Sequence, residues 1–556
     1  MIVLNHGKKI ELKINKDNKQ ANLLQLLRDN GVYISNSCHG NGTCGKCKVR
    51  IKNSSLDVSD RERKVLSKEE LDQGIRLACK IKIEDLLEND GYNQLIVDIL
   101  ESHEENIVVE SVEKKWVNHS EKDAKKTNFF LAIDIGTTTI AMALVDVLTG
   151  DVCDTYVSIN HQRVFGADVI SRIVAANKGL GEKLKQAIEE DLWKGICYFL
   201  KKWDGLNRKE SILLADAQES FLSGVVIAGN TTMMHLLRGC SCESLGKYPF
   251  SSECLEQVEG KLIDFIGNGS QKIYQWACET PTLLMPGISA FIGSDLVAGI
   301  LACPGFEDGS LSFFVDLGTN GEMILGNQDN LFATSVAAGP AFEGGNITCG
   351  TASVPGSICR VKISNRKPII GTIGSKMPPN GICGSGLISA IAQLRKEKMV
   401  DFQGNLLRSF EKEGISLWTD SSGEKISLNQ DDIRQFQMAK SAVRSGIELL
   451  IQKYGCKLED VDKVYVAGGF GTNLVEEDMI LSGLLPREWK GKIEFLGNAA
   501  LLGSMKVGMM RFGDKEEESC CLEVKQKLIL DNVKTISLAN KEEFQQIYIK
   551  NLNFDI

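Results

Sequence analysis

Basic charge, histidine and long apolar runs are all scarce in this sequence of 556 residues. The formal net charge is −9, which disfavours nucleic acid or an anionic membrane as the main partner. No run of 18 apolar residues is present, and residues 1–6 (MIVLNH) lack the pattern of a signal peptide. We therefore expect a cytoplasmic protein without a membrane span. Six histidines give little support to a mechanism based on histidine.

Cysteine, by contrast, is abundant, with 17 residues. A disulfide framework is not expected in a long chain without a secretory signal. Four of the cysteines form a metal-binding pattern, and the others are predicted to be buried free thiols. The chain is longer than one hydrophobic core accommodates, so two to four domains are expected.

The metal-binding pattern lies in residues 37–48 (SCHGNGTCGKCK), where Cys38, Cys44 and Cys47 have the spacing C-x5-C-x2-C. The glycines among them allow the backbone to bend around a bound centre. Cys79 supplies a fourth thiolate, and a clustered trio with one distant cysteine is typical of a [2Fe–2S] cluster. A structural zinc site is the alternative, but zinc usually joins two C-x2-C pairs and only one occurs here.

Residues 1–100 have the pattern of a small domain around this loop. Ser59 and Glu62 have the spacing of a capping box at the start of a polar helix. Residues 101–128 differ, because they are dense in charges of both signs, and they predict an exposed linker. Strands are expected at residues 1–4, 9–14, 47–52 and 94–100, and a helix at residues 22–30. This order resembles the β-grasp ferredoxin domain, in the form with five residues between the first two cysteines.

From residue 129 onward the chain has an α/β pattern with an imperfect internal repeat, residues 129–146 (FFLAIDIGTTTIAMALVD) and 313–326 (FFVDLGTNGEMILG). In each copy an apolar strand ends at an aspartate, Asp134 or Asp316, a Gly-Thr turn follows, and a second apolar strand returns. No Walker loop is present. Two such hairpins predict a phosphate clamp. Turn amides and threonine hydroxyls bind the β- and γ-phosphates, and the aspartates hold Mg²⁺ mostly through water.

Other glycine-rich segments fit the same arrangement. Residues 464–471 (VYVAGGFG) predict an apolar strand that leads into Gly468 and Gly469, where a backbone without side chains can lie against adenine and ribose. Helices rich in small residues are expected at residues 286–301, 382–394 and 495–507.

The order of these elements resembles the superfamily of actin, sugar kinases and chaperone ATPases across residues 129–540. The resemblance implies an α/β multidomain protein in which two RNase-H-like lobes, residues 129–305 and 306–556, hinge over ATP. It also implies roles for individual residues. The first phosphate loop comprises Asp134, Gly136, Thr137, Thr138 and Thr139. The second comprises Asp316, Gly318, Thr319 and Asn320, and the nucleoside lies at Gly468, Gly469 and Phe470.

A [2Fe–2S] domain joined to such an ATPase resembles the reductive activators of corrinoid proteins. The likeness extends over the whole length and includes residues 228–235 (AGNTTMMH) and 338–345 (AGPAFEGG). It implies ATP-dependent transfer of an electron from the cluster to Co(II) of a corrinoid (cobalamin) methyltransferase protein, which restores Co(I). It also implies an upstream electron donor and, as in many such families, a homodimer. Glu343, between glycines, is a candidate for orienting the attacking water, whereas His235 in an apolar run is expected to be a core residue.

Two other functions remain open at the level of sequence. A small-molecule kinase with a regulatory cluster would need a catalytic base, for which Asp295 is one candidate. A redox-sensing, chaperone-like ATPase would use the cluster only to report oxidation. Activators of 2-hydroxyacyl-CoA dehydratases share the ATPase fold but carry a [4Fe–4S] cluster between subunits, which the ferredoxin-like domain here disfavours.

Overall fold

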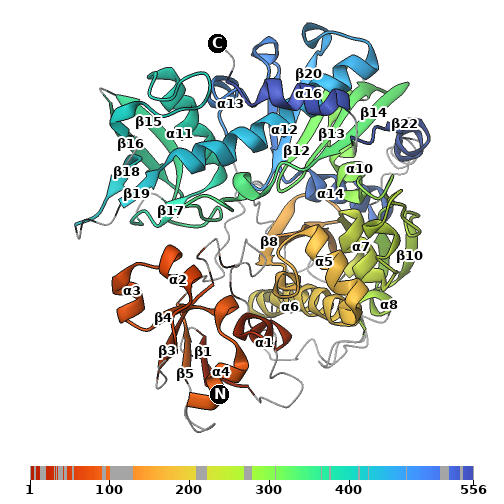
Figure 1. Ribbon diagram of the computed structural model, residues 1–556. Helices are drawn as coiled ribbons and strands as arrows, with labels where there is room; N and C mark the ends of the chain where they lie inside the picture. The colour runs from red at the N-terminus through yellow and green to blue at the C-terminus, as the bar shows by residue number, and fades with distance from the viewer. Residues whose placement is uncertain are drawn as a thin grey trace. The chain divides into compact units, whose positions relative to one another are not determined.

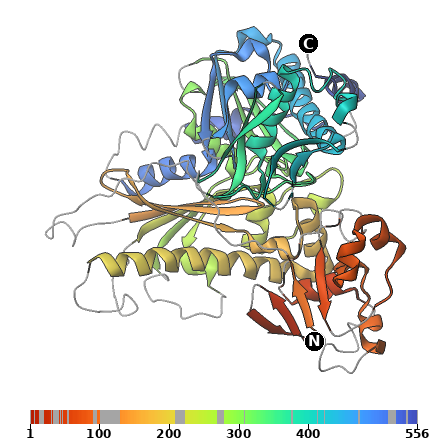
Figure 2. The ribbon, with the colours of Figure 1, turned by 90° about the vertical axis from the view of Figure 1, so that its left-hand side faces the viewer.

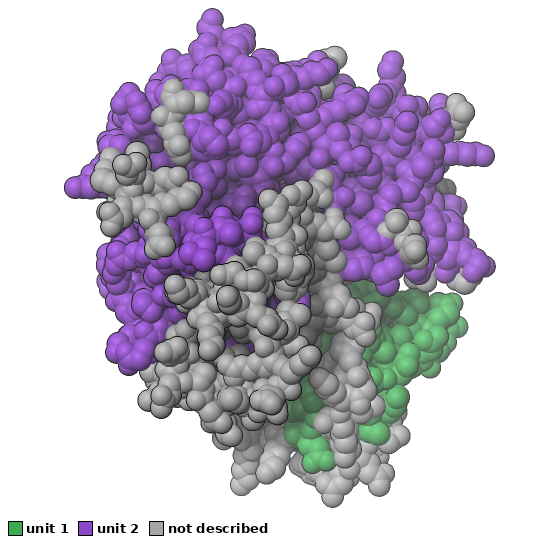
Figure 3. Space-filling view, turned by 180° about the vertical axis from the view of Figure 1, so that it is seen from behind, with its two compact units in different colours: residues 1–105, 161–180 green, residues 106–160, 181–556 purple. Residues whose placement is uncertain are grey.

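The computed structural model describes most of the chain, as two units (Figure 3). Unit 1 comprises residues 1–105 and 161–180, and unit 2 comprises residues 106–160 and 181–556. The predicted linker at residues 101–128, and Cys38 and Cys44 of the metal-binding pattern, lie outside the described residues. The described residues are 2–5, 8–12, 21–30, 32, 34, 42, 45, 47–52, 56–89, 96–100, 129–207, 222–267, 279–306, 309–364, 366–374, 377–410, 413–421, 423, 425–470, 473–513, 525–538 and 542–554.

The N-terminal part of unit 1 is a five-stranded mixed sheet with the strand order β2-β1-β5-β3-β4 (Figure 1). Its strands are β1 (Ile2–Asn5), β2 (Lys8–Glu11), β3 (Lys48–Lys52), β4 (Ile75–Leu77) and β5 (Ile96–Ile99). Strands β1 and β5 are parallel, and the other pairs are antiparallel. Helix α1 (Leu23–Asp29) begins where the side chain of Asn22 accepts a hydrogen bond from Gln25 N, and its leucines pack in one core with Val3, Val49 and Val97. The predicted β-grasp fold is confirmed.

The remaining elements of unit 1 are short. They are α2 (Asp60–Val65), α3 (Lys68–Asp72), η2 (Ala78–Lys80), α4 (Ile83–Asn89), η3 (His161–Val164), α5 (Val169–Ala175) and η4 (Ala176–Leu180). The predicted capping box is present in α2, because the Ser59 side chain accepts from Glu62 N while the Glu62 side chain accepts from Ser59 N. This cap starts α2 at Asp60 and positions the Glu62 carboxylate.

Unit 2 contains two six-stranded sheets with similar topology. The internal repeat predicted from the sequence is therefore also present in the structure. The first has the order β10-β11-β9-β6-β7-β8 and the second β21-β20-β12-β13-β14-β22. In each, three strands form an antiparallel meander whose first strand pairs in parallel with a later strand, β9 or β20. This is the arrangement expected of two RNase-H-like lobes.

The strands of these sheets have the following bounds. The first sheet comprises β6 (Phe129–Ile135), β7 (Thr139–Asp146), β8 (Val152–Ile159), β9 (Leu222–Gly229), β10 (Val258–Lys261) and β11 (Pro281–Leu284). The second comprises β12 (Ser312–Leu317), β13 (Gly321–Asn327), β14 (Asn330–Val336), β20 (Lys463–Gly468), β21 (Ile493–Gly497) and β22 (Val533–Thr535).

Helices cover both sheets. The long helix α6 runs along one face of the strands β7 and β8 (Figure 2), and α14 packs on β6 and β9. Helix α12 packs on β13 and β14. The helices of unit 2 are α6 (Gly181–Asn207), α7 (Thr231–Arg238), α8 (Leu262–Ile266), α10 (Ser294–Ala302), α11 (Gly384–Lys396), α12 (Gln430–Tyr454), α13 (Glu476–Leu481), α14 (Ala499–Phe512) and α16 (Glu542–Asn551).

Helices α10 and α14 cross so closely that their backbones are in contact. A Cβ atom on Gly503 would lie 1.8 Å from the carbonyl oxygen of Ala298, which no side chain tolerates. Only glycine therefore allows this crossing. The close helix packing expected of the small residues near Gly503 is confirmed.

Two smaller sheets extend the second lobe. One has the order β16-β15-β17, and the other pairs β18 with β19. Their strands are β15 (Ser357–Ser364), β16 (Lys367–Thr372), β17 (Gly381–Ile382), β18 (Ile415–Thr419) and β19 (Lys425–Leu428).

Two of the predicted helices begin later than expected. Residues 493–497 form the strand β21, and α14 starts only after Asn498, whose side chain accepts from Leu501 N. Residues 286–293 form a loop, and α10 starts at Ser294. The loop is needed because Gly293 lies against the backbone of Asn230, where a Cβ atom would be 2.6 Å from its Cα. The third predicted helix is confirmed as α11.

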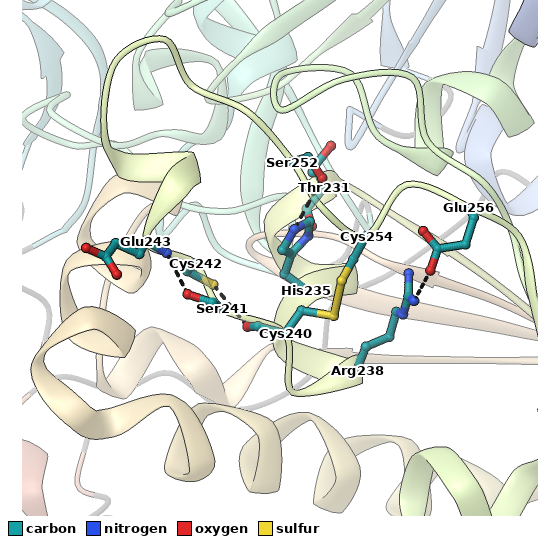
Figure 4. Close-up of a disulfide and its surroundings, with 10 residues drawn as sticks. All are labelled: Thr231, His235, Arg238, Cys240, Ser241, Cys242, Glu243, Ser252, Cys254 and Glu256. Atoms are coloured by element: carbon teal, nitrogen blue, oxygen red, sulfur yellow. Dashed lines mark hydrogen bonds and ion pairs between the residues drawn. A yellow bond between two sulfur atoms is a disulfide. The ribbon is translucent and has the colours of Figure 1, made fainter.

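The expectation of free thiols is wrong for Cys240 and Cys254, which form a disulfide (Figure 4). Helix α7 ends at Gly239 in a left-handed conformation, and Cys240 follows this turn with its Cα 6.9 Å from that of Cys254. Other described cysteines, such as Cys242 and Cys383, are buried thiols outside any disulfide, as predicted. Among the described residues, no helix is long and apolar enough to cross a membrane.

Candidate functional site

The first predicted phosphate loop is a tight turn between β6 and β7. Gly136 N donates to the carbonyl of Thr139 at 2.9 Å, and a Cβ atom on Gly136 would lie 2.8 Å from that oxygen. Asn160 supports the turn twice, since its N–H donates to Thr138 O and its side-chain Nδ2 donates to Gly136 O, both at 2.9 Å. The backbone of the loop is therefore held in place before any ligand binds.

The second predicted loop, between β12 and β13, is built in the same way. Gly318 N donates to Asn320 O at 2.8 Å, which closes the turn. Gly339 N donates to Thr319 O at 2.9 Å and ties the turn to the start of the short helix η8 (Pro340–Glu343).

Glu343 joins the two loops. Its Oε2 accepts a hydrogen bond from Thr138 Oγ1 at 2.6 Å. Its Oε1 accepts from Thr319 N at 2.8 Å and from Thr319 Oγ1 at 3.0 Å. The Glu343 carboxylate thus accepts hydrogen bonds from donors on both hairpins. These hydroxyl and amide donors are the predicted phosphate ligands.

Four more carboxyl groups lie near these loops: Asp134 on β6, Asp295 on α10, Asp316 on β12 and Glu322 on β13. Burial raises the pKa of Asp134 to about 7, and the charge of Asp295 adds to the shift. Burial likewise raises the pKa of Asp295 to about 6. The pKa of Asp316 rises to about 8 through burial and the charges of Asp295, Asp134 and Glu343. For Glu322, burial and the charges of Asp295 and Asp316 raise the pKa well above its ordinary value.

These groups keep part of their surface open to solvent, yet they lie deep enough to repel one another. A cation placed among them would relieve that repulsion, so the residues fit Mg²⁺. No group of three or more His, Cys, Asp or Glu side chains arranged to hold a metal directly is found in the described part of the chain.

Two asparagines that sequence reasoning missed complete the site. Asn498 Nδ2 donates to Asp134 Oδ2 at 2.8 Å, and Asn230 Nδ2 donates to Thr137 Oγ1 at 3.0 Å. Each asparagine also caps a helix, because Asn498 Oδ1 accepts from the first turn of α14 and Asn230 Oδ1 from that of α7. A shared signal exists in the sequence: each follows a glycine that ends a strand, as Gly-Asn. The dipeptide alone does not identify them, because Gly-Asn also occurs elsewhere, for example at Gly326-Asn327 and Gly404-Asn405.

The predicted nucleoside glycines lie at the end of β20. Gly468, with φ +137°, is level with Leu317 of β12, and a Cβ atom there would be 2.4 Å from Leu317 O. Gly469 has open space on the side where a Cβ atom would stand. The ring of Phe470 is buried and lies 6.2 Å from that of Phe342 in the core, so its backbone rather than its ring is placed to face a ligand.

His235 is a satisfied core residue, as expected. Its Nδ1 lies 2.8 Å from Thr231 O and its Nε2 lies 3.2 Å from Ser252 Oγ (Figure 4). Burial lowers the pKa of the imidazole, which favours the neutral form.

In unit 1, Cys47 and Cys79 come together, with their Sγ atoms 3.4 Å apart and both side chains buried. Ala78 N donates to Cys47 O at 2.8 Å, which sets this register. Gly42 and Gly45 have φ angles of +76° and +67°, as a loop that bends around a bound centre requires. Two thiol sulfurs at this distance fit ligation of one metal.

A buried ion pair holds the backbone of the residues directly before Cys79. Arg76 Nη2 lies 2.8 Å from Glu62 Oε2, and the two side chains are 7% and 0% exposed. Glu62 Oε1 also accepts from Leu77 N at 3.0 Å. Hydrogen bonds from Arg76, Ser59 and Leu77 lower the pKa of Glu62 overall, although burial, the largest single effect, raises it.

Comparison with protein families gives three consecutive matches. Residues 5–84 match the 2Fe-2S iron-sulfur cluster binding domain. Residues 129–304 match the RACo middle region, and residues 310–555 match the C-terminal domain of RACo, the ASKHA domain. The chain therefore has the [2Fe–2S] domain and the ATPase fold that the sequence indicated.

Individual relatives agree over most of the length. The chain is 30% identical to the corrinoid activation enzyme RamQ of Eubacterium limosum over 78% of this chain and 71% of that protein. It is 24% identical to the [Co(II) methylated amine-specific corrinoid protein] reductase of Methanosarcina barkeri over 76% of each chain. A solved structure, "Reductive activator for corrinoid,iron-sulfur protein", matches with a TM-score of 0.66 and 26% identity, covering 100% of this chain and 98% of that one. The chain therefore belongs to the family of corrinoid activation enzymes.

Proposed function

We propose that the protein is an ATP-dependent reductive activator that transfers an electron from its [2Fe–2S] cluster to Co(II) of a corrinoid protein and so restores Co(I). One observation carries this proposal above the others. A single chain combines a buried cysteine pair 3.4 Å apart with two aspartate hairpins that Glu343 joins. The relatives named above are corrinoid activators, which supports the same substrate class.

We assign the ligands of the cluster to Cys38, Cys44, Cys47 and Cys79. When bound, the cluster supplies a one-electron carrier. The chain's own contribution is to hold two of the four thiols together through the Ala78 N–H and the Glu62–Arg76 pair. The domains assigned are residues 1–100 for the cluster, 101–128 for a linker, and 129–305 and 306–556 for the ATPase lobes.

In the ATPase, the two hairpins bind the phosphates. The turn amides that do not close the turns, together with the neighbouring threonine hydroxyls, donate to phosphate oxygens. Asp134 and Asp316 would hold Mg²⁺, an ion that prefers to keep several water ligands. Glu343 leaves the threonines when the phosphates arrive and orients the attacking water. The remaining loop residues, Thr137, Thr138, Thr139, Thr319 and Asn320, line the phosphates, and Gly468, Gly469 and the backbone of Phe470 lie at the nucleoside.

Energetics explain why ATP is needed. Ferredoxin-type clusters of the plant class have potentials of about −400 mV. An acceptor about 100 mV lower makes the transfer of one electron uphill by about 2.3 kcal/mol. Closure of the lobes on ATP changes the affinity of the activator for the Co(II) and Co(I) states of the corrinoid protein. About 5.5 kcal/mol of differential affinity moves a two-state equilibrium from 1:99 to 99:1. Nucleotide-driven closure can therefore offset the uphill step.

The test combines reduced protein, Mg-ATP and a Co(II) corrinoid protein, and it follows the absorption band of Co(I). We expect Co(I) only when ATP is present, and none with Asp316→Ala. A sugar-dependent turnover of ATP, with no Co(I) from any corrinoid protein, would instead identify a kinase. An upstream electron donor, a homodimer and a cytoplasmic location belong to the same proposal, and size measurement and cell fractionation test the last two.

A further inference from the structure

The charge of this protein is distributed very unevenly. Residues 344–396 contain no aspartate or glutamate, although the whole chain has a net charge of −9. Seven cations lie in this segment: Arg360, Lys362, Arg366, Lys367, Lys376, Arg395 and Lys396. A basic segment inside an acidic chain indicates a surface for an acidic partner, provided that its cations are exposed.

Four of these cations, Arg360, Lys362, Arg366 and Lys367, lie on the hairpin of β15 and β16, at the left of unit 2 in Figure 1. Along β15 the side chains alternate between buried and exposed, with Arg360 and Lys362 exposed. The buried side chains of the strand, Val361 and Ile363, pack in the core that α11 completes. The opposite face of the hairpin is therefore the one that carries the charge.

An apolar residue stands among these cations. Ile369 is level with Lys362 across the two strands, and Lys367 is level with Ser364. Ile369 is 58% exposed and so presents an apolar side chain to solvent among these cations. An apolar centre with a charged rim is the arrangement found in protein interfaces.

Little within the protein neutralises this face. Lys362, Arg366 and Lys367 form no ion pair with any residue that the structure describes. Arg360 feels the charge of Asp478. The two cations at the end of α11 are engaged elsewhere, because Lys396 pairs with Glu477 at 3.2 Å and Arg395 donates to Val400 O.

We propose that the outer face of the β15–β16 hairpin, formed by Arg360, Lys362, Arg366, Lys367 and Ile369, docks an acidic protein partner. Resting on the proposed function, we assign that partner as the corrinoid protein. A polyanion such as nucleic acid is disfavoured, because the chain as a whole is acidic and the face is small and has an apolar centre. Rim charges of this kind act mainly on the rate of association and are screened by salt within a Debye length of about 8–10 Å.

The experiment compares two double charge reversals with the same change in net charge. K362E/K367E reverses the hairpin, and K457E/K490E reverses two exposed lysines elsewhere in unit 2. The Michaelis constant for the corrinoid protein in the Co(I) assay is measured at low and high salt. For K362E/K367E we expect it to rise about tenfold at low salt and to lose most of its salt dependence. The rate at saturating partner and the ATPase rate without partner should stay unchanged. The control should stay within about twofold of wild type throughout.

The uncharged variant Ile369→Ser tests the apolar centre and should raise the Michaelis constant severalfold without changing its dependence on salt. Equal Michaelis constants for the two double variants, with normal activation by both, overturn the docking proposal alone. Loss of a dimer in K362E/K367E with an unchanged Michaelis constant also overturns it and assigns the face to a second copy of this chain. A wild-type protein that neither binds nor activates any corrinoid protein overturns both proposals.

Discussion

Removal of the Glu343 carboxylate should tighten the binding of ATP while slowing its hydrolysis. This carboxylate accepts hydrogen bonds from Thr138 Oγ1, Thr319 N and Thr319 Oγ1. The same donors are the proposed phosphate ligands, so ATP must displace Glu343 before it binds. Replacement by alanine removes the competitor and one negative charge from the site.

The size of the effect follows from the three contacts. A hydrogen bond to a charged group contributes about 1.5–3 kcal/mol. Phosphate oxygens replace the carboxylate as acceptors, and the released carboxylate gains water, so most of this energy is recovered. If one such bond is left uncompensated, the dissociation constant for ATP is roughly 10- to 150-fold higher in the wild type than in a protein without the Glu343 carboxylate. We expect Glu343→Ala to bind ATP about tenfold more tightly, at the lower end of that range.

The assay is calorimetric titration of Glu343→Ala and Glu343→Gln with Mg-ATP and with Mg-ADP, alongside hydrolysis rates. Glutamine retains an acceptor for Thr319 but loses the charge, so its affinity should lie between those of alanine and wild type. ADP lacks the γ-phosphate and should gain less than ATP. Hydrolysis should fall by about 10²- to 10⁴-fold, the usual contribution of a group that positions a proton acceptor. Weaker binding of ATP by Glu343→Ala, or unchanged hydrolysis, would refute this reasoning.

Three further outcomes are expected. Asp134 and Asp316 have pKa values raised from 3.8 to about 7 and about 8, so between pH 4 and 8 the folded protein holds protons that the unfolded chain has lost. The Tm of the protein without nucleotide should therefore fall as the pH rises from 4 to 8 and level off above that range. Calorimetry can measure this change in Tm. Glu62→Ala leaves Arg76 buried and unpaired and should lower the free energy of unfolding of the N-terminal domain by about 3–5 kcal/mol in a denaturant titration. Cys79→Ser should abolish the visible absorption of the cluster and leave the dissociation constant for ATP unchanged, as titration can show.

The first two of these outcomes have matched controls. Asp134→Asn with Asp316→Asn should flatten the pH dependence of Tm, and an unchanged slope contradicts the assignment. The exposed pair Lys82–Glu84 serves as the control for the buried pair, since Glu84→Ala should cost about 0–1 kcal/mol. Equal losses in the two variants would show that burial of the ion pair is unimportant.

Local patterns in the sequence predicted the parts of the site that lie on one hairpin. The Asp-x-Gly-Thr turns at Asp134 and Asp316 were located correctly because strand, turn and returning strand are adjacent in the chain. The contact of Asn498 with Asp134 spans 364 residues, and no periodicity in either segment encodes it. The bridging position of Glu343 was missed for the same reason, although its presence between glycines marked it as a candidate.

The errors in helix boundaries have a common physical cause. The helices predicted at residues 286–301 and 495–507 were started too early, because tertiary contacts require a loop at residues 286–293 and a strand at residues 493–497. Strand β21 pairs in parallel with β20, and this pairing outweighs local preference. The disulfide of Cys240 and Cys254 depends on a left-handed turn at Gly239 and on a chain return that local sequence does not specify.

The crossing of α10 and α14 at Gly503 links the nucleotide site to more distant parts of the second unit. Asp295 lies in the first turn of α10, and Asn498, which holds Asp134, caps the start of α14. Both helices therefore begin among the carboxylates and then meet where Gly503 touches Ala298 O. With no side chain between them at that point, backbone contact alone sets the distance between the two helices. A larger residue at position 503 would push the helices apart and so shift Asp295 and Asn498, which stand at their starts, relative to each other.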